Sequence, residues 1–577
     1  MVKEDAGDDT KVAPELPVAQ RGLTSWILSG PVLLRVAAVL VFVVYLKTVG
    51  FDFVFDDHLQ ISLNPWLSSW KYVPIFFHKQ LWGFTAYYTT ANYYRPVFML
   101  WLFLVQQVTG GAPGWFHLCT IGLHLVVVYQ VYALTRLLMK NETVAGIAAL
   151  LFGLHPTKVE TVAWISGGSE PLEAMFLFGT LICYLHAREG VRRKAWMAGA
   201  IVFFLGALFA KETAILVPLM MAVYEFYASS EKRYRRLWAA IRPAIPYFAL
   251  SGVYWAIRWH VMHGLSEMSY MLSIPKTIWT LPEACWFYIL HTVWPFRLSE
   301  YYPLMIEWNF SVKYTLLPAI PLIALGWIGW RYARRSPEWA LLATMYVLSL
   351  APVIATVLLI QPHDRYLYVP TYPAAVLAAT MICKLRWRDE RTSGALRVGV
   401  VTALVAVFIA GTVVQFRWWD NDLALMKRAV EIAPNHIPAR VILAGAYSEN
   451  GEMGKAMAIL HETVQQFPDS QRAWEALGIQ EYLNGDIKDA KVTLLESLKK
   501  PTDELNKTMS IYYLGMIAYD TGHYEDAVRW YTLAIGMRPK SGGFHTSLAL
   551  ALDKLGRHEE AKQARAIERR IDNFQSQ

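Results

Sequence analysis

Residues that could perform chemistry stand beside the apolar segments of this 577-residue chain. An acidic pair, Asp56 and Asp57, follows the first long apolar run, and the pair Lys211 and Glu212 separates two later runs. A charge inside a bilayer costs about 2.5–3.5 kcal/mol per residue, so such groups usually lie in water or are retained for function. Other ionisable residues at such junctions are Arg95, His155, Lys158, Glu160, His363, Asp364 and Arg365.

Carboxylates beside cations suit the transfer of a group from a phosphate-linked donor. Lysine, arginine and histidine offset the charge that develops on a leaving phosphate, and a carboxylate can accept the proton of an acceptor hydroxyl. Each junction also has a structural interpretation: a solvated loop, a local ion pair or a marker of the membrane interface. Several junctions on one face favour the functional interpretation. An ion-coupled transporter would place its charges nearer the bilayer midplane.

The elements that position these residues are membrane spans. The chain is 55% hydrophobic and 17% charged, whereas soluble proteins are near 25% charged. A spanning helix needs about 20 apolar residues. We predict eleven spans, at residues 32–50, 115–138, 143–156, 169–187, 195–210, 213–228, 244–262, 314–330, 338–360, 365–384 and 397–416. Residues 195–228 must form two of them, because one helix would be about 51 Å long.

Basic loops set the predicted orientation. Lysine and arginine in short loops favour the cytoplasmic side, and the strongest basic loops are residues 188–194, 232–236, 331–335 and 384–388. All four basic loops lie on the cytoplasmic side only if the apolar stretches 96–110 and 277–296 do not cross the membrane. These stretches would then lie in the interface or form re-entrant segments. The N-terminus is then inside, and the charged junctions and the C-terminus are outside. These loops account for the net charge of +8, so no nucleic-acid partner is expected.

The last 160 or so residues read as a soluble repeat domain. Gly451, Gly485, Gly522 and Gly556 are spaced 34, 37 and 34 residues apart, and alanines and leucines repeat in the same register. A period near 34 residues indicates tetratricopeptide repeats. We expect about four repeats, with residues 418–434 as a leading half-repeat. Such an α-solenoid binds a polypeptide on its concave side.

The predicted fold is therefore all-α, a polytopic membrane domain followed by an α-solenoid. The predicted domains are a cytoplasmic tail at 1–31, a membrane domain at 32–416 with its first outer loop at 51–114, and the repeats at 417–577. Four cysteines lie in apolar segments without CxxC or Cys/His spacing, so neither a disulfide framework nor a zinc site is indicated.

Five motifs in this order resemble the GT-C-fold membrane glycosyltransferases, and specifically the transmembrane and tetratricopeptide-repeat-containing O-mannosyltransferases and their bacterial relatives. The motifs are Phe55-Asp56-Asp57 with Ile61 and Asn64, Tyr94-Arg95-Pro96 with Phe116-His117-Leu118 and His124, His155-Pro156 with Glu160 and Trp164, Lys211-Glu212-Thr213, and Asp364 to Pro370. The chain departs from the family at Ser166 to Glu170, where an expected arginine is missing, and at Asp364, where the family usually has glutamate. Because this arginine is missing, the resemblance does not determine which sugar the donor carries.

The resemblance implies an inverting transfer from a polyprenyl-phosphate sugar to a serine or threonine hydroxyl. Asp56 would be the general base, and Asp57 would share that role or position the acceptor. Arg365 and Lys211 would bind the lipid phosphate, with Glu212 orienting Lys211.

The resemblance assigns the other junction residues to the donor as well. His155 and His363 would support the phosphate, Lys158 and Glu160 would line the sugar pocket, and the donor-binding set also includes Arg95 and Asp364. No cofactor is implied; the acidic pair binding a divalent cation is the lesser alternative.

Two other functions remain open at this point. The sugar could pass to a glycan or lipid, with the repeats binding an assembly partner, or the protein could be a non-enzymatic scaffold or transporter. The leading hypothesis has as partners the bilayer, a lipid-linked sugar and a protein acceptor. We expect a bacterial inner membrane with periplasmic repeats; the alternative is an endoplasmic-reticulum membrane with lumenal repeats.

Overall fold

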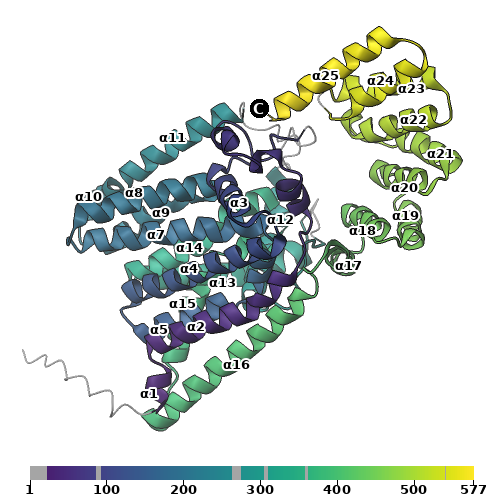
Figure 1. Ribbon diagram of the computed structural model, residues 1–577. Helices are drawn as coiled ribbons and strands as arrows, with labels where there is room; N and C mark the ends of the chain where they lie inside the picture. The colour runs from purple at the N-terminus through teal and green to yellow at the C-terminus, as the bar shows by residue number, and fades with distance from the viewer. Residues whose placement is uncertain are drawn as a thin grey trace, which may run out of the picture.

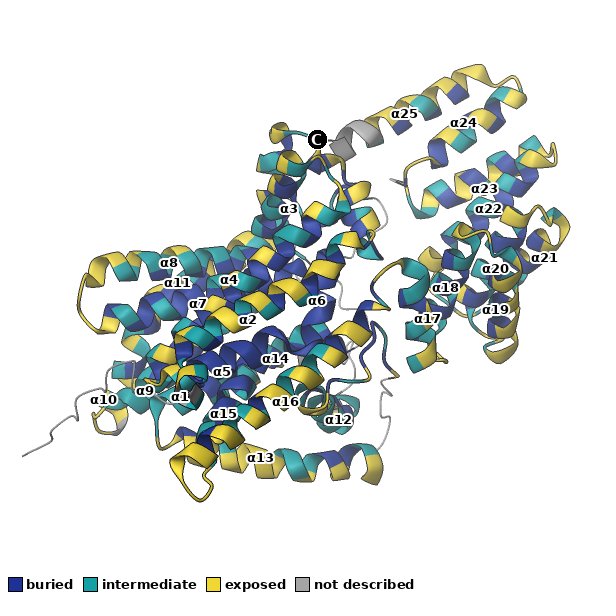
Figure 2. Cartoon of the chain, turned by 60° about the horizontal axis from the view of Figure 1, so that its bottom comes forward, coloured by how far each residue is buried: buried dark blue, intermediate teal, exposed yellow. Residues whose placement is uncertain are grey.

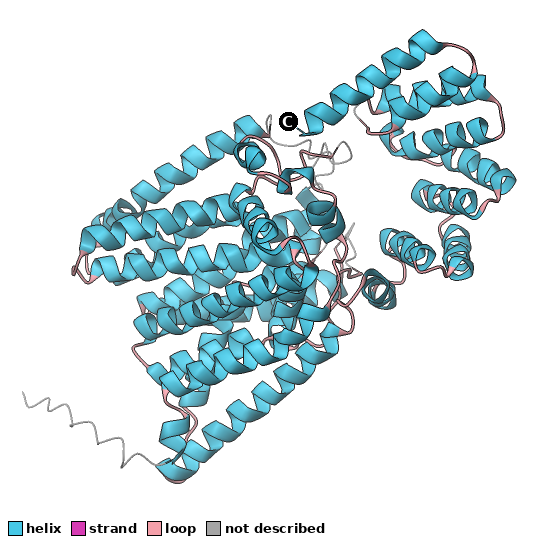
Figure 3. Ribbon diagram, in the orientation of Figure 1, coloured by secondary structure: helices cyan, strands magenta, loops and turns pink. Residues whose placement is uncertain are grey.

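The computed structural model describes residues 23–85, 93–262, 274–303, 310–357, 362–539 and 541–576. Within these ranges the chain is helical and contains no strand (Figure 3). A large helical bundle is followed by a curved array of helix pairs (Figure 1). The predicted all-α fold class is confirmed. Of the predicted tail at 1–31, residues 1–22 lie outside the described part of the chain.

Each predicted span corresponds to a helix of the bundle. In lipid every backbone N–H and C=O must be paired internally, which a helix achieves within one segment. The corresponding helices are α2 (Gly30–Tyr45), α4 (Pro113–Met139), α5 (Glu142–Gly153), α7 (Ser169–Arg188), α8 (Arg193–Ala210), α9 (Val217–Ala228), α11 (Ile245–Val261), α13 (Leu317–Ala333), α14 (Pro337–Val357), α15 (Thr371–Cys383) and α16 (Glu390–Phe416). Among the described residues, 5 helical segments are long and apolar enough to cross a membrane by length and composition.

The two stretches predicted to lie in the interface or re-enter are also helical. Helix α3 (Pro96–Thr109) has 14 residues, about 21 Å, which is shorter than the hydrocarbon core. Helix α12 (Ile274–Val293) has 20 residues and packs against α13 and α14. Its length alone would permit a crossing, so the interfacial placement of α12 stays a prediction.

The predicted interruption between α8 and α9 is confirmed. Helix α8 ends at Ala210, and the next residue, Lys211, has an extended backbone with φ −159° and ψ 140°. A 3₁₀ turn, Glu212–Leu216, follows before α9 begins. This break presents the charged pair at the end of the bundle that carries the other charged loops.

Burial in the bundle follows the expected placement in lipid. Helix α4 lies inside, with 61% of its apolar window buried, whereas the segment Val312–Ala333, which contains α13, is only 11% buried. Figure 2 shows the buried helices surrounded by helices with exposed faces. The short helices of this domain are α1 (Leu23–Ile27), α6 (Val159–Ala163) and α10 (Arg233–Ile241). Basic α10 and the start of α16 lie at the end of the bundle away from the repeats (Figure 1).

Helix pairs build the repeat array, and the predicted turns are confirmed. The turn glycines Gly451, Gly485, Gly522 and Gly556 have φ of 76°, 89°, 80° and 75°, the left-handed region that glycine enters without steric cost. After α17 (Asp422–Ile432), the pairs are α18 (Ile437–Glu449) with α19 (Met453–Gln466), α20 (Gln471–Asn484) with α21 (Ile487–Leu498), α22 (Thr508–Asp520) with α23 (Tyr524–Met537), and α24 (Phe544–Lys554) with α25 (His558–Ser576).

Candidate active site

The predicted junctions meet at the end of the bundle nearest the repeats. Hydrogen bonds join the loop after α2 to the turn before α7, and the loop after α5 to the turn before α15. An ion pair joins the residue before α3 to the turn after α8. Residues more than a hundred positions apart therefore form one layer of polar side chains.

Asp57 is an anchor within this layer. Its side chain is fully buried. Oδ1 accepts hydrogen bonds from the Ser166 backbone N–H at 2.7 Å and from the Ser166 hydroxyl at 2.6 Å. Oδ2 receives longer bonds, both at 3.4 Å, from the N–H groups of Val54 and Ile165. This geometry differs from the prediction that Asp57 contacts the acceptor, because four donors already occupy both of its oxygens.

Asp56, in contrast, is partly exposed. It makes no hydrogen bond within the described part of the chain, and Arg365 lies within electrostatic range. The preceding residue, Phe55, has φ 53°, an uncommon conformation for an aromatic residue that clusters at functional sites. The two adjacent carboxylates therefore have different surroundings: hydrogen-bond donors enclose Asp57, whereas Asp56 is only partly buried.

The strained turn is held from the repeat side. Asp422, at the start of α17, accepts a hydrogen bond from the Phe55 N–H at 2.7 Å and contacts His58 Nε2 at 2.7 Å. Asp422 was not predicted as a site residue. Its signal in the sequence was weak, since it is one of many acidic residues in a soluble domain. A cavity of about 350 Å³ opens beside this contact, lined by residues that include Asp52, His58 and Asp422.

Arg365 is the central cation. Its Nη1 lies 2.5 Å from Glu160 Oε1 and 3.5 Å from Glu300 Oε1, and its N–H donates to Glu160 Oε2 at 2.9 Å. Its guanidinium also lies 5.0 Å from the Trp164 ring centre and 5.1 Å from that of Tyr366. The side chain keeps 16% of its surface exposed, so one edge can reach a ligand.

The predicted pairing of Glu212 with Lys211 is wrong. Glu212 instead forms a two-pronged ion pair with Arg95, at 2.8 and 3.1 Å. Lys211 lies 2.5 Å from Glu170 and 3.8 Å from Glu173 of α7. Adjacent side chains on an extended backbone point in opposite directions, which separates the two partners. Glu170 and Glu173 were missed, although two carboxylates three residues apart in an apolar helix were a usable signal.

The cations of the site differ in side-chain exposure, and only the more exposed ones can reach a phosphate. The Arg95 side chain is 13% exposed, a fraction similar to the 16% of Arg365. Lys211 is 4% exposed and enclosed by carboxylates. Arg95 lies 4.5 Å from the Tyr93 ring centre, and Tyr93 interacts electrostatically with Tyr366 and Arg365. The two arginines and two tyrosines therefore form the accessible part of the site.

Lys211→Met is expected to lower the free energy of unfolding by about 3–5 kcal/mol, because it leaves buried carboxylates without their cation. Denaturant titration of the purified protein in detergent measures this loss. The matched control is the triple variant Lys211→Met/Glu170→Gln/Glu173→Gln, which should recover most of the stability. A stable single variant that has lost donor binding would instead make Lys211 a phosphate ligand.

Two predicted donor residues are placed inside the protein. Lys158 is fully buried and donates to the Tyr368 carbonyl at 2.7 Å and to the Thr371 hydroxyl. His155 contacts the Thr157 hydroxyl at 2.8 Å and the Thr292 carbonyl at 3.1 Å. These contacts correct the predicted roles in the sugar pocket and at the phosphate, because both side chains are used to hold loops together.

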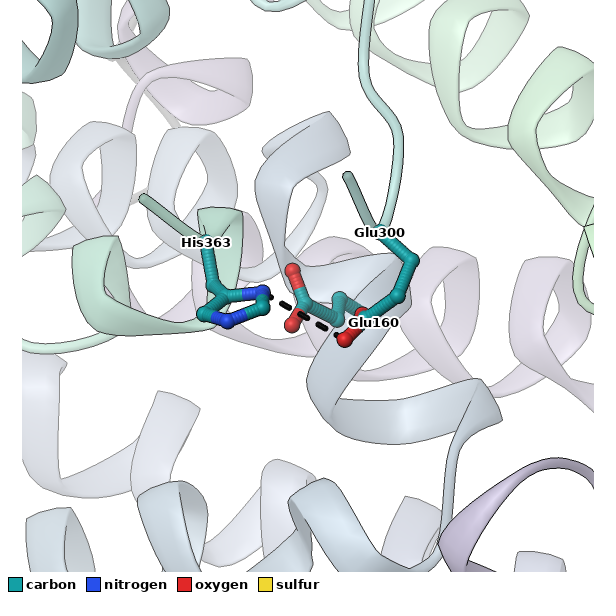
Figure 4. Close-up of side chains that lie close together, drawn as sticks. All are labelled: Glu160, Glu300 and His363. Carbon is teal, nitrogen blue, oxygen red and sulfur yellow. Dashed lines mark ion pairs between the residues drawn. The ribbon is translucent and has the colours of Figure 1, made fainter. Parts of the chain in front are cut away.

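His363 and Asp364 lie behind Arg365. His363 Nδ1 is 3.3 Å from Glu300 Oε1, and Asp364 accepts a hydrogen bond from the Tyr302 hydroxyl. Figure 4 shows His363, Glu160 and Glu300 directed toward one another from separate segments. Glu300 was missed by the sequence analysis, although an acidic residue just beyond a long apolar aromatic stretch was the same signal that identified Asp56.

Comparisons with known proteins found a repeat family and several similar proteins. Residues 423–478 and 510–541 match the tetratricopeptide-repeat family. Protein O-mannosyl-transferase Tmtc2 of Drosophila melanogaster is 31% identical over 201 residues, covering 32% of this chain and 21% of that protein. Human protein O-mannosyl-transferase TMTC2 is 27% identical over 201 residues, covering 33% and 24%. The chain resembles the protein O-mannosyl-transferases.

The similarity to protein O-mannosyl-transferase F38B6.6 of Caenorhabditis elegans extends further. The two are 22% identical over 428 residues, which cover 70% of this chain and 59% of that protein. The chain spans about a quarter or less of the length of the insect and human O-mannosyl-transferases. Among solved structures, the Archaeoglobus fulgidus oligosaccharyltransferase is 12% identical, with 68% of this chain and 56% of that chain covered and a TM-score of 0.39.

Proposed function

We propose that this protein is a GT-C-type O-glycosyltransferase that moves a sugar from a polyprenyl-phosphate donor to serine or threonine hydroxyls of protein acceptors on the non-cytoplasmic side. The observation that carries the proposal is that one partly exposed carboxylate, Asp56, lies within electrostatic range of one partly exposed guanidinium, Arg365, at the same bundle end. The similarity to protein O-mannosyl-transferases supports mannose as the sugar.

Asp56 suits the acceptor hydroxyl, and Arg365 suits the leaving phosphate. Asp56 accepts the hydroxyl proton of the acceptor as its oxygen attacks the anomeric carbon. The bond from that carbon to the phosphate oxygen breaks, and polyprenyl phosphate leaves with its charge offset by Arg365 and Arg95. Attack opposite the leaving group inverts the anomeric configuration. Tyr93 and Tyr366, beside these arginines, provide flat apolar faces for the sugar.

The junction with the repeats supports a protein acceptor. Asp422 connects α17 to the turn that carries Asp56, so a polypeptide held by the repeats would be presented beside the base. The cavity beside Asp52 and His58 opens at this junction. Tetratricopeptide repeats bind polypeptides along the array, which favours a protein over a glycan or lipid acceptor.

The test uses the full chain purified in nanodiscs. Polyprenyl-phosphate mannose and a Ser/Thr-rich peptide are supplied, and intact mass of the peptide is measured. The expected result is a mass increase of one hexose, with the sugar in inverted configuration. Transfer to a glycan or lipid acceptor but not to peptide would overturn the protein-acceptor part, and no transfer with any polyprenyl-phosphate sugar would overturn the enzyme assignment.

The pH dependence of transfer should report Asp56. Burial raises the pKa of Asp56 to about 6, while Arg365 opposes the shift; Glu300 and Tyr301 are the other ionisable groups that face it. A base must be ionised, so kcat/KM is expected to be half its maximum near pH 6, nearly full about one unit above it, and to fall about tenfold per unit well below it. Rates of peptide mannosylation across buffers measure the profile. A profile unchanged from about pH 7 down to about pH 5 would contradict a role for this carboxylate.

A further inference from the structure

Behind Arg365 lies a second cluster whose chemistry the transfer reaction does not use. Glu160 of α6 and Glu300 and His363 of two separate loops each offer a ligand atom within 4.8 Å of the other two. Their exposed fractions are 3%, 1% and 6%. Figure 4 shows the imidazole and the carboxylates converging on one point.

Polar atoms in this cluster have no hydrogen-bond partner. Glu300 Oε2 and His363 Nδ1 are fully buried and make no hydrogen bond with the described residues. His363 Nδ1 approaches Glu300 Oε1 at 3.3 Å without hydrogen-bond geometry. A buried polar group that is left unpaired is unfavourable. Both atoms belong to residues whose ligand atoms lie within 4.8 Å of one another, and both can donate an electron pair to a cation.

The charge balance indicates that this ligand is a cation. Glu160, Glu300 and the neighbouring Asp364 are buried carboxylates, and Arg365 is the cation within salt-bridge distance of the first two. Buried charges are normally paired or coordinate a metal. Arg365 Nη1 contacts Glu160 Oε1 and Glu300 Oε1, whereas Glu300 Oε2 and His363 Nδ1 keep lone pairs that no hydrogen bond from a described residue uses.

We propose that Glu160, Glu300 and His363 bind one divalent transition-metal ion. Two carboxylates and one imidazole form a ligand set used for Mn²⁺ and Zn²⁺. The ion would stand behind Arg365, raise the positive charge next to the accessible guanidinium, and fix the loops that carry Glu300 and His363. The proposal concerns binding alone, and it stands whether or not the protein transfers a sugar.

The test measures metal directly. The full chain in nanodiscs is stripped with a chelator, equilibrated with Mn²⁺ or with Zn²⁺ and freed of excess ion. Elemental analysis then counts the bound ion. About one ion per chain is expected with at least one of the two metals. In the Mn²⁺ form, pulsed electron paramagnetic resonance should detect one coordinated imidazole nitrogen.

Variants assign the ion to this cluster. Glu300→Gln and His363→Gln are each expected to weaken metal binding at least about tenfold, and His363→Gln should also remove the nitrogen signal. Glu225→Gln is the matched control, because Glu225 is a carboxylate in an ion pair with Arg188 elsewhere in the bundle; it should bind metal like the parent chain. No retained ion with either metal, or equal retention in both cluster variants, would overturn the proposal.

Discussion

Asparagine in place of Asp56 is expected to reduce the rate of sugar transfer about 10²–10⁴-fold, the usual contribution of a general base. The amide keeps the shape of the side chain but cannot take the acceptor proton. Because Asp56 makes no hydrogen bond within the described residues, the variant should fold as the parent chain does. Initial rates of peptide mannosylation in nanodiscs, with the stability measured in parallel, give the result.

Two other carboxylates make this test specific. Glu231→Gln is the matched control, since Glu231 is an exposed acidic residue outside the candidate site and should retain the parent rate. Asp57→Asn should act differently, because it weakens the anchor to Ser166 and is expected to lower both stability and rate. Full activity in Asp56→Asn and in Asp57→Asn would make the general-base assignment wrong.

Arg365→Lys is expected to raise the KM for the lipid-linked donor about 10- to 100-fold, with a smaller change in the KM for the acceptor. Lysine keeps the charge but loses the flat fork that contacts Glu160 and Glu300 while facing a phosphate. Charged hydrogen bonds contribute about 1.5–3 kcal/mol each, which matches this range. Steady-state rates at varied donor and fixed peptide separate the two constants.

The chain offers a matched arginine for the Arg365 test. Arg188 pairs with Glu225 at 2.7 Å and lies 5.0 Å from the Tyr224 ring centre, an environment like that of Arg365 but made by residues that contribute nothing to the candidate site. Arg188→Lys should leave the donor KM unchanged. If Arg365→Lys folds and also leaves it unchanged, the donor phosphate is held elsewhere, and Arg95 with Glu212 becomes the first alternative.

Patterns local in the sequence determined the architecture. The apolar runs predicted the positions of the bundle helices, because a spanning segment must be apolar; α5, α9 and α15, with 12, 12 and 13 residues, are nevertheless shorter than a full crossing. The repeat period predicted the turn glycines, which all have positive φ. The charged junctions were predicted to lie on one face, and the structure brings them together at one end of the bundle. These inferences needed only spacing along the chain.

Tertiary structure alone decided which of these charges is paired and which is accessible. Asp56 and Asp57 are adjacent and chemically identical, yet Ser166 from a distant loop encloses one of them. Glu212 pairs with Arg95 in preference to its neighbour Lys211, and Glu300 enters the site from a segment with no motif. Pairing depends on distances between loops that are far apart in sequence, and burial decides whether a charge must be neutralised or can act on a substrate.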